Sequence, residues 1–243
     1  MRPEEYQKLA DLEERMWFFR AYHRRFAHWF ARTLPAGPAT LLDAGCGTGG
    51  AIRALHVAHP EWGLTGLDCS PLACAFARER TGAAIVEGSI TAMPFADGAF
   101  DGIVSADVVC QVDDPALAVR EFARCVRPGG VVMVNVPAYM WLWSHHDVAV
   151  QSVRRFTRPE LAGHFRDAGL EVIYASYANG FLLPPAILRR KVFPPRRPTS
   201  DVALLPAPLE ALFASLAWLE FQWTRRGWAV PAGLSVFVVG RKC

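Results

Sequence analysis

The sequence predicts an α/β fold in which helices cover both faces of a mostly parallel sheet. Short apolar runs typical of buried strands alternate with longer helical segments, and a glycine cluster follows the first of these runs. The 243 residues are 52% hydrophobic and only 20% charged, which is too apolar for a disordered chain. We therefore expect one large domain, or one domain with an insertion, around a sizeable core.

The first elements expected are one or two helices between residues 4 and 34, where aromatic side chains recur at near-helical intervals. Residues 40–42 then read as a short buried strand, residues 45–50 as a glycine-rich loop, and residues 51–59 as a helix. This strand, loop and helix unit is the first of a series.

The same alternation continues to the end of the chain. We expect further strands at 63–67, 83–86, 100–105, 131–136, 170–177 and 234–239, and helices at 71–80, 115–126 and 159–168. The segment Arg127-Pro128-Gly129-Gly130 should turn the chain from a helix into the fifth strand, and Gly169 should end the helix before the sixth.

About fifty residues between the last two strands do not fit the alternation. Prolines 184, 185, 194, 195, 198, 206 and 208 divide this stretch into short pieces. After them, one apolar face of an amphipathic helix is expected from Leu209, Leu212, Phe213, Leu216 and Leu219. We expect an N-terminal helical cover at 1–36, an α/β domain at 37–178 and 232–243, and a helical insertion or lid at 179–231.

Composition excludes several classes of protein. The net charge of +3 is too small for a dedicated nucleic-acid binder. The N-terminus shows neither signal nor transit peptide, and residues 172–188 fall short of a membrane span. Six cysteines without a CxxC pair indicate reduced thiols in a cytoplasmic protein, and no metal site is expected.

The glycine loop after the first strand is the strongest functional signal. Gly45, Gly47 and Gly49 allow a tight turn and a close approach to a ligand, and Asp68 ends the second strand, where it can accept hydrogen bonds from a ribose. The loop also fits the dinucleotide pattern GxGxxG through Gly50. Asp43, however, would repel a pyrophosphate and could hold a cationic aminoacyl group.

Four segments in the correct order resemble class I S-adenosylmethionine (SAM)-dependent methyltransferases. Leu41–Gly50 resembles motif I of that family and Gly66–Ser70 its acidic ribose-binding motif. Glu87–Asp101 is similar to the segment in which that family contacts adenine. Arg127–Gly130 is similar to the family's turn before strand five. The resemblance covers about residues 39–177 and implies a Rossmann-like fold with seven mostly parallel strands, the last pair antiparallel.

The resemblance also implies a cofactor site. It places the loop glycines against the aminoacyl and ribose parts of SAM, Asp43 toward its ammonium group and Asp68 on the ribose diol. Cys69 would pack on the adenine, and Ser89, where the family most often has Asp, would border it. The predicted cofactor-binding residues are Asp43, Gly45, Gly47, Gly49, Asp68, Cys69, Ser89, Ile90, Trp17, Arg20 and Gln111.

Two further segments resemble a bacterial small-molecule subgroup with a Trp-rich N-terminal helix and a Trp-Ser-x-His-Asp motif. They are Trp17–Arg20 and Trp143–Asp147. The chain departs from the subgroup by having Cys110-Gln111 in place of Glu-His, Ser152-Val153 in place of His and Tyr, and Phe156 in place of Tyr. These departures remove several possible proton acceptors.

Three functional hypotheses remain open. The first is methyl transfer, in secondary metabolism, to a small or lipid-like acceptor in a dry, aromatic-lined cleft, with His145, Tyr139, Tyr177 and Asn179 as catalytic candidates. The second is a cyclase in which the amine of SAM attacks its own γ-carbon, giving azetidine-2-carboxylate and methylthioadenosine. The third is a SAM-binding module at a membrane surface or on a partner.

The third hypothesis depends on basic pairs and triplets around the apolar insertion. They are Arg189-Arg190-Lys191, Arg196-Arg197 and Arg225-Arg226. The same surface could instead form a lid or the contact of a homodimer. Under either enzyme hypothesis the partner is a small molecule, or none beyond SAM, and not a nucleic acid.

Overall fold

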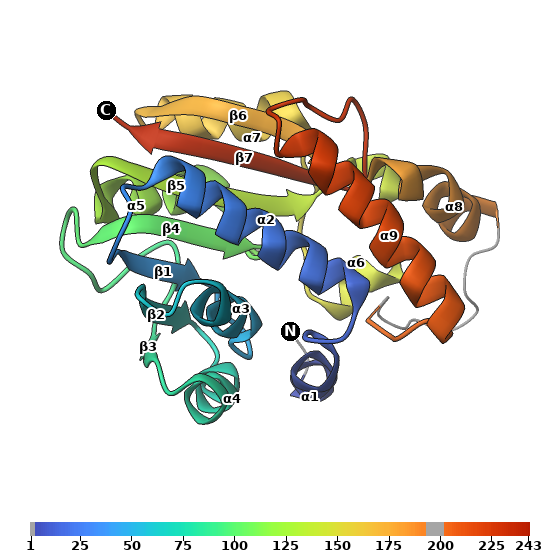
Figure 1. Cartoon of the computed structure of the whole chain (residues 1–243), viewed down its shortest axis with the longest axis horizontal. Coiled ribbons are helices and arrows are strands. Elements are labelled where there is room, and N and C mark those ends of the chain that lie inside the picture. Colours follow the sequence, from blue (N-terminus) through green and yellow to red (C-terminus); the bar gives the residue numbers. More distant parts are fainter. Residues whose placement is uncertain (1–2, 193–201) are drawn as a thin grey trace.

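The computed structural model describes residues 3–192 and 202–243, with side chains from residue 5 to 191 and from 202 on. Its centre is one seven-stranded sheet in the order β3-β2-β1-β4-β5-β7-β6, in which β7 runs antiparallel to both of its neighbours (Figure 1). The strands are β1 Thr40–Ala44, β2 Gly63–Asp68, β3 Ala84–Glu87, β4 Phe100–Ala106, β5 Val126–Pro137, β6 Leu170–Ala178 and β7 Ser235–Lys242. The predicted mostly parallel α/β sheet is confirmed.

Helices cover both faces of this sheet. α2 and α3 lie on one face, α5 and α7 on the other, and α4 packs beside β2 and β3. The α-helices are α1 Pro3–Leu12, α2 Trp17–Thr33, α3 Gly50–Ala58, α4 Pro71–Thr81, α5 Pro115–Cys125, α6 His145–Ala149, α7 Arg158–Asp167, α8 Leu183–Ile187 and α9 Ala207–Thr224. Single turns of 3-10 helix, η1 Val109–Gln111, η2 Met140–Leu142 and η3 Gly180–Leu182, and a π-turn η4 Leu188–Val192 join them.

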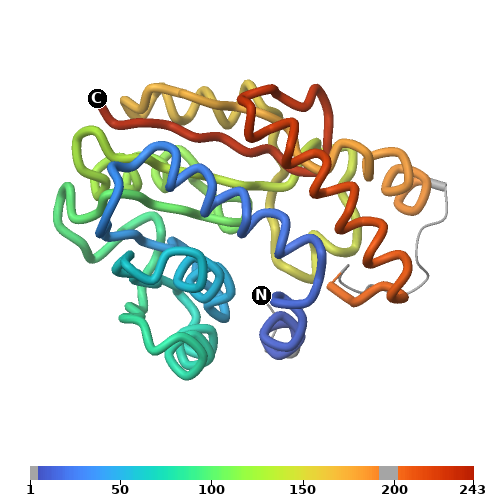
Figure 2. The backbone as a smooth tube through the Cα atoms, in the orientation of Figure 1, coloured from blue at the N-terminus to red at the C-terminus, as the bar shows by residue number. Residues whose placement is uncertain are grey.

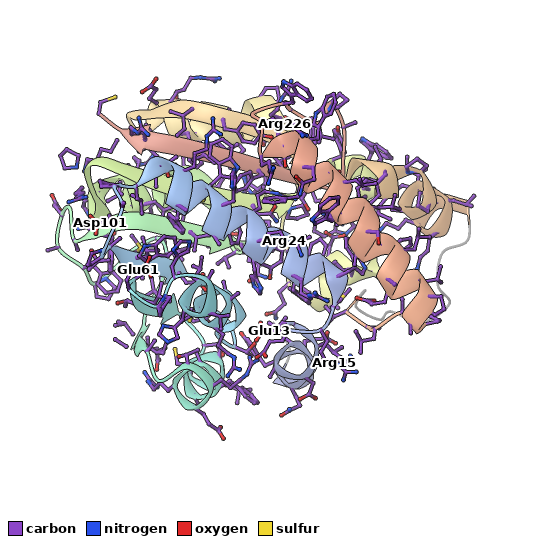
Figure 3. All side chains as sticks on the ribbon, in the orientation of Figure 1. Glu13, Arg15, Arg24, Glu61, Asp101 and Arg226 are labelled. Atoms are coloured by element: carbon purple, nitrogen blue, oxygen red, sulfur yellow. The ribbon has the colours of Figure 1, made fainter. Side chains whose placement is uncertain are left out.

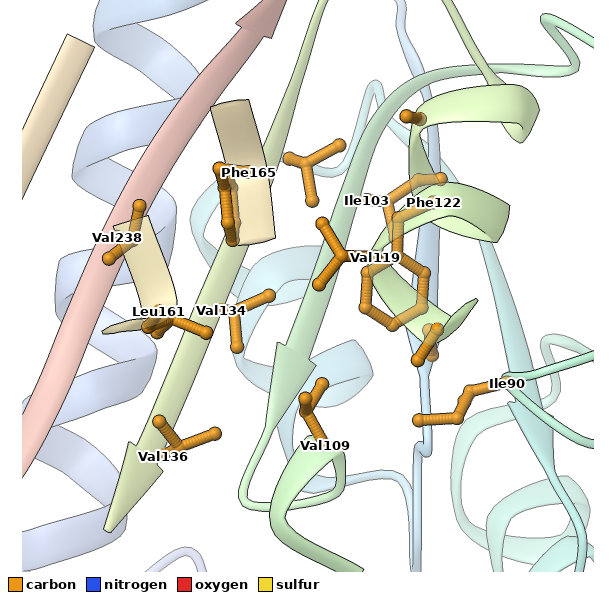
Figure 4. Packing of buried hydrophobic residues seen from close by; sticks show 14 of the residues in the cluster. Ile90, Ile103, Val109, Val119, Phe122, Val134, Val136, Leu161, Phe165 and Val238 are labelled. Carbon is orange, nitrogen blue, oxygen red and sulfur yellow. The ribbon is translucent and has the colours of Figure 1, made fainter. Parts of the chain in front are cut away.

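The larger part of the core lies between the sheet and the helices α5 and α7 (Figure 4). Phe122 of α5 and Phe165 of α7 are fully buried there against strand residues such as Ile103 and Val134. Burying each such side chain contributes about 1.5–3 kcal/mol to folding. This packing fixes the carboxyl ends of β4 and β5 relative to each other.

The opposite face of the sheet is covered by α2. Phe26 and Phe30 are fully buried against β-strand residues that include Val104 and Phe237. A Cβ at Gly102 of β4 would lie 2.4 Å from Phe30, so this glycine allows the helix to approach the strand. The helices predicted between residues 4 and 34 are present as α1 and α2, and α2 covers this face of the sheet.

The start of β5 differs from the prediction. The strand begins at Val126 and not at Val131, because Val126 pairs with Phe100 and the pairing resumes at Val131 with Gly102. Residues 127–130 form an irregularity within the strand, with Gly129 at a φ of 78°, rather than a turn before it.

Helices α2 and α9 run side by side in the same direction (Figures 1 and 2). The Trp17 amide donates to Glu210 near the start of both helices, and Arg32 donates to the carbonyl of Arg225 at their ends. Both pairs are separated by 193 residues, which is the signature of parallel packing in register. The first helical cover and the late insertion thus form one layer.

The predicted apolar face of α9 is wrong in part, since Phe213 packs against Trp17 but three of its leucines do not turn inward. Leu209, Leu212 and Leu219 are exposed, whereas the buried residues of the helix are Ala217, Glu220 and Thr224. The helix is apolar on nearly every side, so its sequence period could not indicate which face turns inward. Among the described residues, no helix is long and apolar enough to cross a membrane.

Candidate functional site

The glycine loop connects β1 to α3 at the carboxyl end of the sheet's strands. Gly45, Gly47 and Gly49 all adopt positive φ angles of 91°, 53° and 87°, a region that residues with a Cβ rarely enter. At Gly45 a Cβ would also lie 2.2 Å from the side chain of Val108. The loop therefore needs glycine for its shape, as a loop that closely approaches a ligand does.

Asp68, at the end of β2, holds this loop in place. Its Oδ2 atom accepts a hydrogen bond of 2.9 Å from the Gly47 amide, and its Oδ1 atom accepts one of 2.9 Å from the Ser70 amide. Burial raises the pKa of the carboxyl above its ordinary value, although these amide hydrogen bonds oppose the effect. Asp68 thus lies at the glycine loop, as predicted.

Asp43 lies buried beside Asp68. Burial, followed by the nearby carboxyls of Asp68 and Glu13, raises the pKa of Asp43 to about 8. Tyr22 of α2 faces the same acids, since Asp107, Glu13 and Asp43 all raise the pKa of its buried hydroxyl after burial itself. We call the three acids at the glycine loop, Glu13, Asp43 and Asp68, the carboxyl cluster.

Glu13, in the turn between α1 and α2, reaches the glycine loop from outside the sheet (Figure 3). Its carboxyl accepts a 2.8 Å hydrogen bond from the Thr48 hydroxyl and another from Arg80 of α4. A Cβ at Gly50 would lie 2.2 Å from this carboxyl, so Gly50 makes room for it. The sequence analysis missed Glu13, because nothing local shows that a residue 35 positions earlier contacts Thr48.

Asp107, directly after β4, was also missed. It adopts a left-handed φ of 57°, its amide donates to the Asn135 carbonyl at 2.7 Å, and its Oδ1 accepts from the Asn135 side chain at 3.2 Å. Burial raises its pKa to about 7, opposed by the Asn135 hydrogen bond and by Arg155. The sequence signal that could have indicated Asp107 is its position at the carboxyl end of a central strand, where α/β sheets bind ligands.

Comparison with known proteins identifies the fold and its chemistry. Residues 42–134 match the family described as Methyltransferase domain. The chain is 33% identical to the ubiquinone biosynthesis O-methyltransferase of Pseudomonas paraeruginosa over 164 residues, which cover 60% of this chain and 70% of that one. The chain belongs to the class I SAM-dependent methyltransferases.

Solved structures of methyltransferases share the fold. One, in a complex of the Haloferax volcanii Trm112 methyltransferase activator with a methyltransferase, aligns with a TM-score of 0.62 at 23% identity, covering 98% of this chain and 93% of that one. The geranyl diphosphate C-methyltransferase of Streptomyces coelicolor, solved with S-adenosyl-L-homocysteine, aligns at 0.60 and 19% identity, covering 90% and 78%.

The carboxyl cluster of this methyltransferase fits a cationic cofactor. Carboxyls with raised pKa values are stabilised in their charged form by a cation, and SAM carries positive charge on its sulfonium and ammonium groups. In the described part of the chain, no group of three or more His, Cys, Asp or Glu side chains could hold a metal ion.

The other predicted cofactor residues lie at several places in the methyltransferase. Cys69 is exposed beside Asp68, Ile90 is buried, and the Ser89 hydroxyl lies 2.8 Å from that of Thr91. Gln111 is half-buried in η1. Their contact with SAM stays a prediction.

Trp17 and Arg20 lie in the first turn of α2. Trp17 packs edge-on against Phe213 of α9, with ring centroids 5.7 Å apart, and Arg20 is exposed. Their environment is the layer formed by α2 and α9, and their role toward SAM stays a prediction.

The four predicted catalytic residues are not all brought together. Tyr139 and Tyr177 stack with centroids 5.0 Å apart, and the Tyr177 hydroxyl accepts a hydrogen bond from the Arg158 amide at 3.2 Å. Asn179 is buried in a left-handed conformation, and its Oδ1 atom has no partner among the described residues. His145, by contrast, is exposed at the start of α6.

Asp147 of the predicted Trp-Ser-x-His-Asp motif has a structural role. Asp147 is buried, caps the amide of Ser144 at 2.8 Å, and pairs with Arg155 through bonds of 2.7 and 2.9 Å. Arg155 also donates to the carbonyl of Ala138 at 3.1 Å. This ion pair fixes the segment after β5 beside Asp107.

Proposed function

We propose that this methyltransferase transfers the methyl group of SAM to an oxygen atom of a small or lipid-like organic acceptor. The observation that carries the proposal is the glycine loop with the carboxyls of Glu13, Asp43 and Asp68 beside it, whose charged forms a cationic cofactor would stabilise. The oxygen acceptor is supported by the relative that is named a ubiquinone biosynthesis O-methyltransferase.

The residues that would hold SAM follow from the loop geometry. Asp43 would accept from the ammonium group, Asp68 from the ribose hydroxyls, and the loop glycines would let the backbone approach both. Bound SAM would supply an electrophilic methyl group. The chain's own contribution is to position the acceptor and to exclude water.

We place the proton acceptor for the hydroxyl of the substrate at Asp107. The subgroup's Glu-His after strand four is Cys110-Gln111 here, and Cys110 is buried with its thiol near the Ser152 hydroxyl at 3.7 Å. Asp107 lies just before this position, at the carboxyl end of β4, and its pKa of about 7 suits a general base at neutral pH.

The division into parts stays as proposed from the sequence, namely a cover at 1–36, a SAM-binding domain at 37–178 and 232–243, and an insertion at 179–231. Its support is the contact of α2 with α9, because the cover and the insertion pack on each other above the sheet. The aromatic residues of this layer would keep the acceptor cleft dry.

One observation favours the cyclase as a second candidate. Cyclisation requires a neutral amine on SAM, and a carboxyl with a pKa of about 8 at the ammonium end could take up that proton. Asp43 occupies this position in the proposed cofactor pose.

Incubating the full chain with SAM and no acceptor distinguishes the two reactions. Methyl transfer predicts that SAM is consumed no faster than in buffer alone, as followed by mass spectrometry. Adding a hydroxylated acceptor should then produce S-adenosylhomocysteine. Enzyme-dependent formation of azetidine-2-carboxylate and methylthioadenosine would instead establish the cyclase, and an Asp68→Ala variant controls for uncatalysed breakdown of SAM.

A further inference from the structure

The outer side of α9 and the turn after it expose a set of large apolar side chains. We call this surface the α9 patch, and each of its members is between 43% and 58% exposed: Leu209, Leu212, Trp218, Leu219, Trp223 and Trp228. Three of the six are tryptophans, and Trp223 and Trp228 contact each other with centroids 4.4 Å apart. Exposed large apolar side chains gathered on one element in this way are typical of an interaction site.

No carboxylate of α9 remains on the outer side. The two acids of the helix are Glu210 and Glu220. Glu210 accepts from the amides of Trp17 and Leu205, and Glu220 accepts from those of Asn179 and Gly180. Both acids thus accept hydrogen bonds from backbone amides, so α9 adds no unpartnered carboxylate to the patch.

The side chains around the patch are positively charged. They are Arg20, Arg24 and Arg32 on α2 and Arg225 and Arg226 after α9, all exposed, and α2 contains no acid. None of these five arginines has an ion-pair partner within the described ranges 3–192 and 202–243. Figure 3 shows Arg24 on α2 and Arg226 beyond the end of α9.

Two shallow grooves flank the patch. One, of about 450 Å³, is lined by Arg24, Ala214, Ser215, Trp218 and Leu219, so it joins a guanidinium to an aromatic ring. The other, of about 500 Å³, is lined mostly by apolar residues between Trp223 and Gly180, together with Glu220. The first suits a lipid phosphate and the second an apolar chain.

We propose that the α9 patch binds the surface of an anionic lipid bilayer. Tryptophan and leucine side chains insert at the level of the lipid head groups, where amphipathic rings are favoured. The arginines pair with lipid phosphates, and the absence of acids gives the complementary charge that an anionic surface requires. A second copy of the chain would present the same arginines and meet them with like charge.

Vesicle flotation of the full chain tests this proposal. We expect binding to phosphatidylcholine vesicles with about one third phosphatidylglycerol, little binding to phosphatidylcholine alone, and loss of binding at high salt. A Trp218→Ser/Trp223→Ser variant should lose most of the binding. In an Arg24→Glu/Arg226→Glu variant, the affinity for anionic vesicles should fall by about fivefold for each arginine replaced.

Matched controls lie on other surfaces of the molecule. Val57→Ser, at an 83% exposed position on α3, and Arg166→Glu, at an exposed position on α7, should bind vesicles like the wild type. All the substituted residues are exposed, so melting temperatures should agree within a few degrees.

Several outcomes would overturn the proposal. They are failure of the wild type to float with anionic vesicles, equal flotation by the tryptophan or arginine variants, or a stable dimer in ultracentrifugation that the tryptophan variant abolishes. Flotation requires neither SAM nor turnover. A negative result therefore leaves the proposed methyl transfer unaffected.

Discussion

At the scale of single residues, the buried carboxyl of Asp43 couples the stability of the chain to its cofactor. An ordinary aspartate loses its proton near pH 3.8, whereas Asp43 in the folded chain keeps it to about pH 8. Between these values the unfolded chain binds fewer protons than the folded one, so the stability contributed by this group declines as the pH rises. A bound cation would favour the ionised form of Asp43 and so oppose this loss of stability.

We predict that SAM binding releases a proton from Asp43 at neutral pH. Affinity should therefore increase with pH up to about 8 and level off above it. Calorimetry in two buffers with different heats of ionisation measures the proton released. An Asp43→Asn variant should remove the proton released by this group and weaken the pH dependence; an unchanged pH dependence in the variant would contradict the assignment.

A second prediction concerns Asp107. Its surroundings are Asn135 from β5, Arg155 and Asp147 from the segment after β5, Tyr22 from α2 and Cys110 from η1. If Asp107 takes the acceptor's proton, kcat/KM should rise through pH 7, and Asp107→Asn should remove this limb with a rate loss of about 10²–10⁴-fold.

The same variant separates catalysis from cofactor binding. SAM affinity should stay within about twofold of the wild type, because Asp107→Asn keeps the side chain's shape. A large loss of affinity with normal single-turnover rates would instead make Asp107 a cofactor ligand.

The residue scale also shows what sequence could predict. Asp43, the loop glycines and Asp68 lie within one strand-loop-helix-strand segment, so their proximity follows from local structure. Glu13, in the turn before α2, and Tyr22 of α2 reach the same site from outside the sheet. No local sequence pattern specifies their contacts with the glycine loop. The carboxyl cluster could therefore be predicted only in part.

At the scale of elements, the turn between α1 and α2 contacts the glycine loop through Glu13. Glu13 occupies the space that a side chain at Gly50 would need. α1 also packs against α4, where Arg80 pairs with Glu13 and Glu14. The position of α1 and the shape of the loop should therefore change together.

We predict that Gly50→Ala displaces Glu13 and weakens SAM binding more than tenfold while the sheet remains folded. In a double variant with Glu13→Ala, the added methyl group has room, so the two losses should not add. Calorimetric affinities for the four proteins measure this coupling. Gly163→Ala in α7 is the control, since nothing lies within 4 Å of its Cβ, and it should stabilise the fold by about 0.5–1 kcal/mol. If the losses of affinity in the double variant were additive, the contact between Gly50 and Glu13 would not control the site.

Element boundaries were predicted well where a local signal exists. Pro71 and Pro115 in the first turns, after the caps Ser70 and Asp114, begin α4 and α5 as expected. α6 was missed because it has only five residues, although its Ser144 and Asp147 form a capping box that the sequence displays. The orientation of α9 depends on its contact with α2, and periodicity could not indicate it.

At the scale of the whole molecule, Glu220 connects three distant parts of the chain. It accepts hydrogen bonds of 2.7 Å from the amides of both Asn179 and Gly180 and lies 3.8 Å from Arg25 of α2. The carboxyl is buried, so its removal would leave an unpaired arginine and two unpaired amides inside the protein.

We predict that Glu220→Ala lowers the free energy of unfolding by about 3–5 kcal/mol. Urea denaturation measures the loss, and limited proteolysis should show cleavage between β6 and β7 before the rest of the chain. Glu171→Ala, at an exposed position on β6, should change stability by less than about 0.5 kcal/mol. Equal stabilities of the two variants would mean that Glu220 does not hold the insertion.

The parallel pairing of α2 with α9 also sets an order of events during synthesis. The Trp17 amide at the start of α2 donates to Glu210, and Arg25 of the same helix faces Glu220. A nascent chain that has left the ribosome only as far as β6 already contains α2 but none of these partners. The first long helix to be synthesised must therefore wait for α9, almost the last, before its polar groups are satisfied.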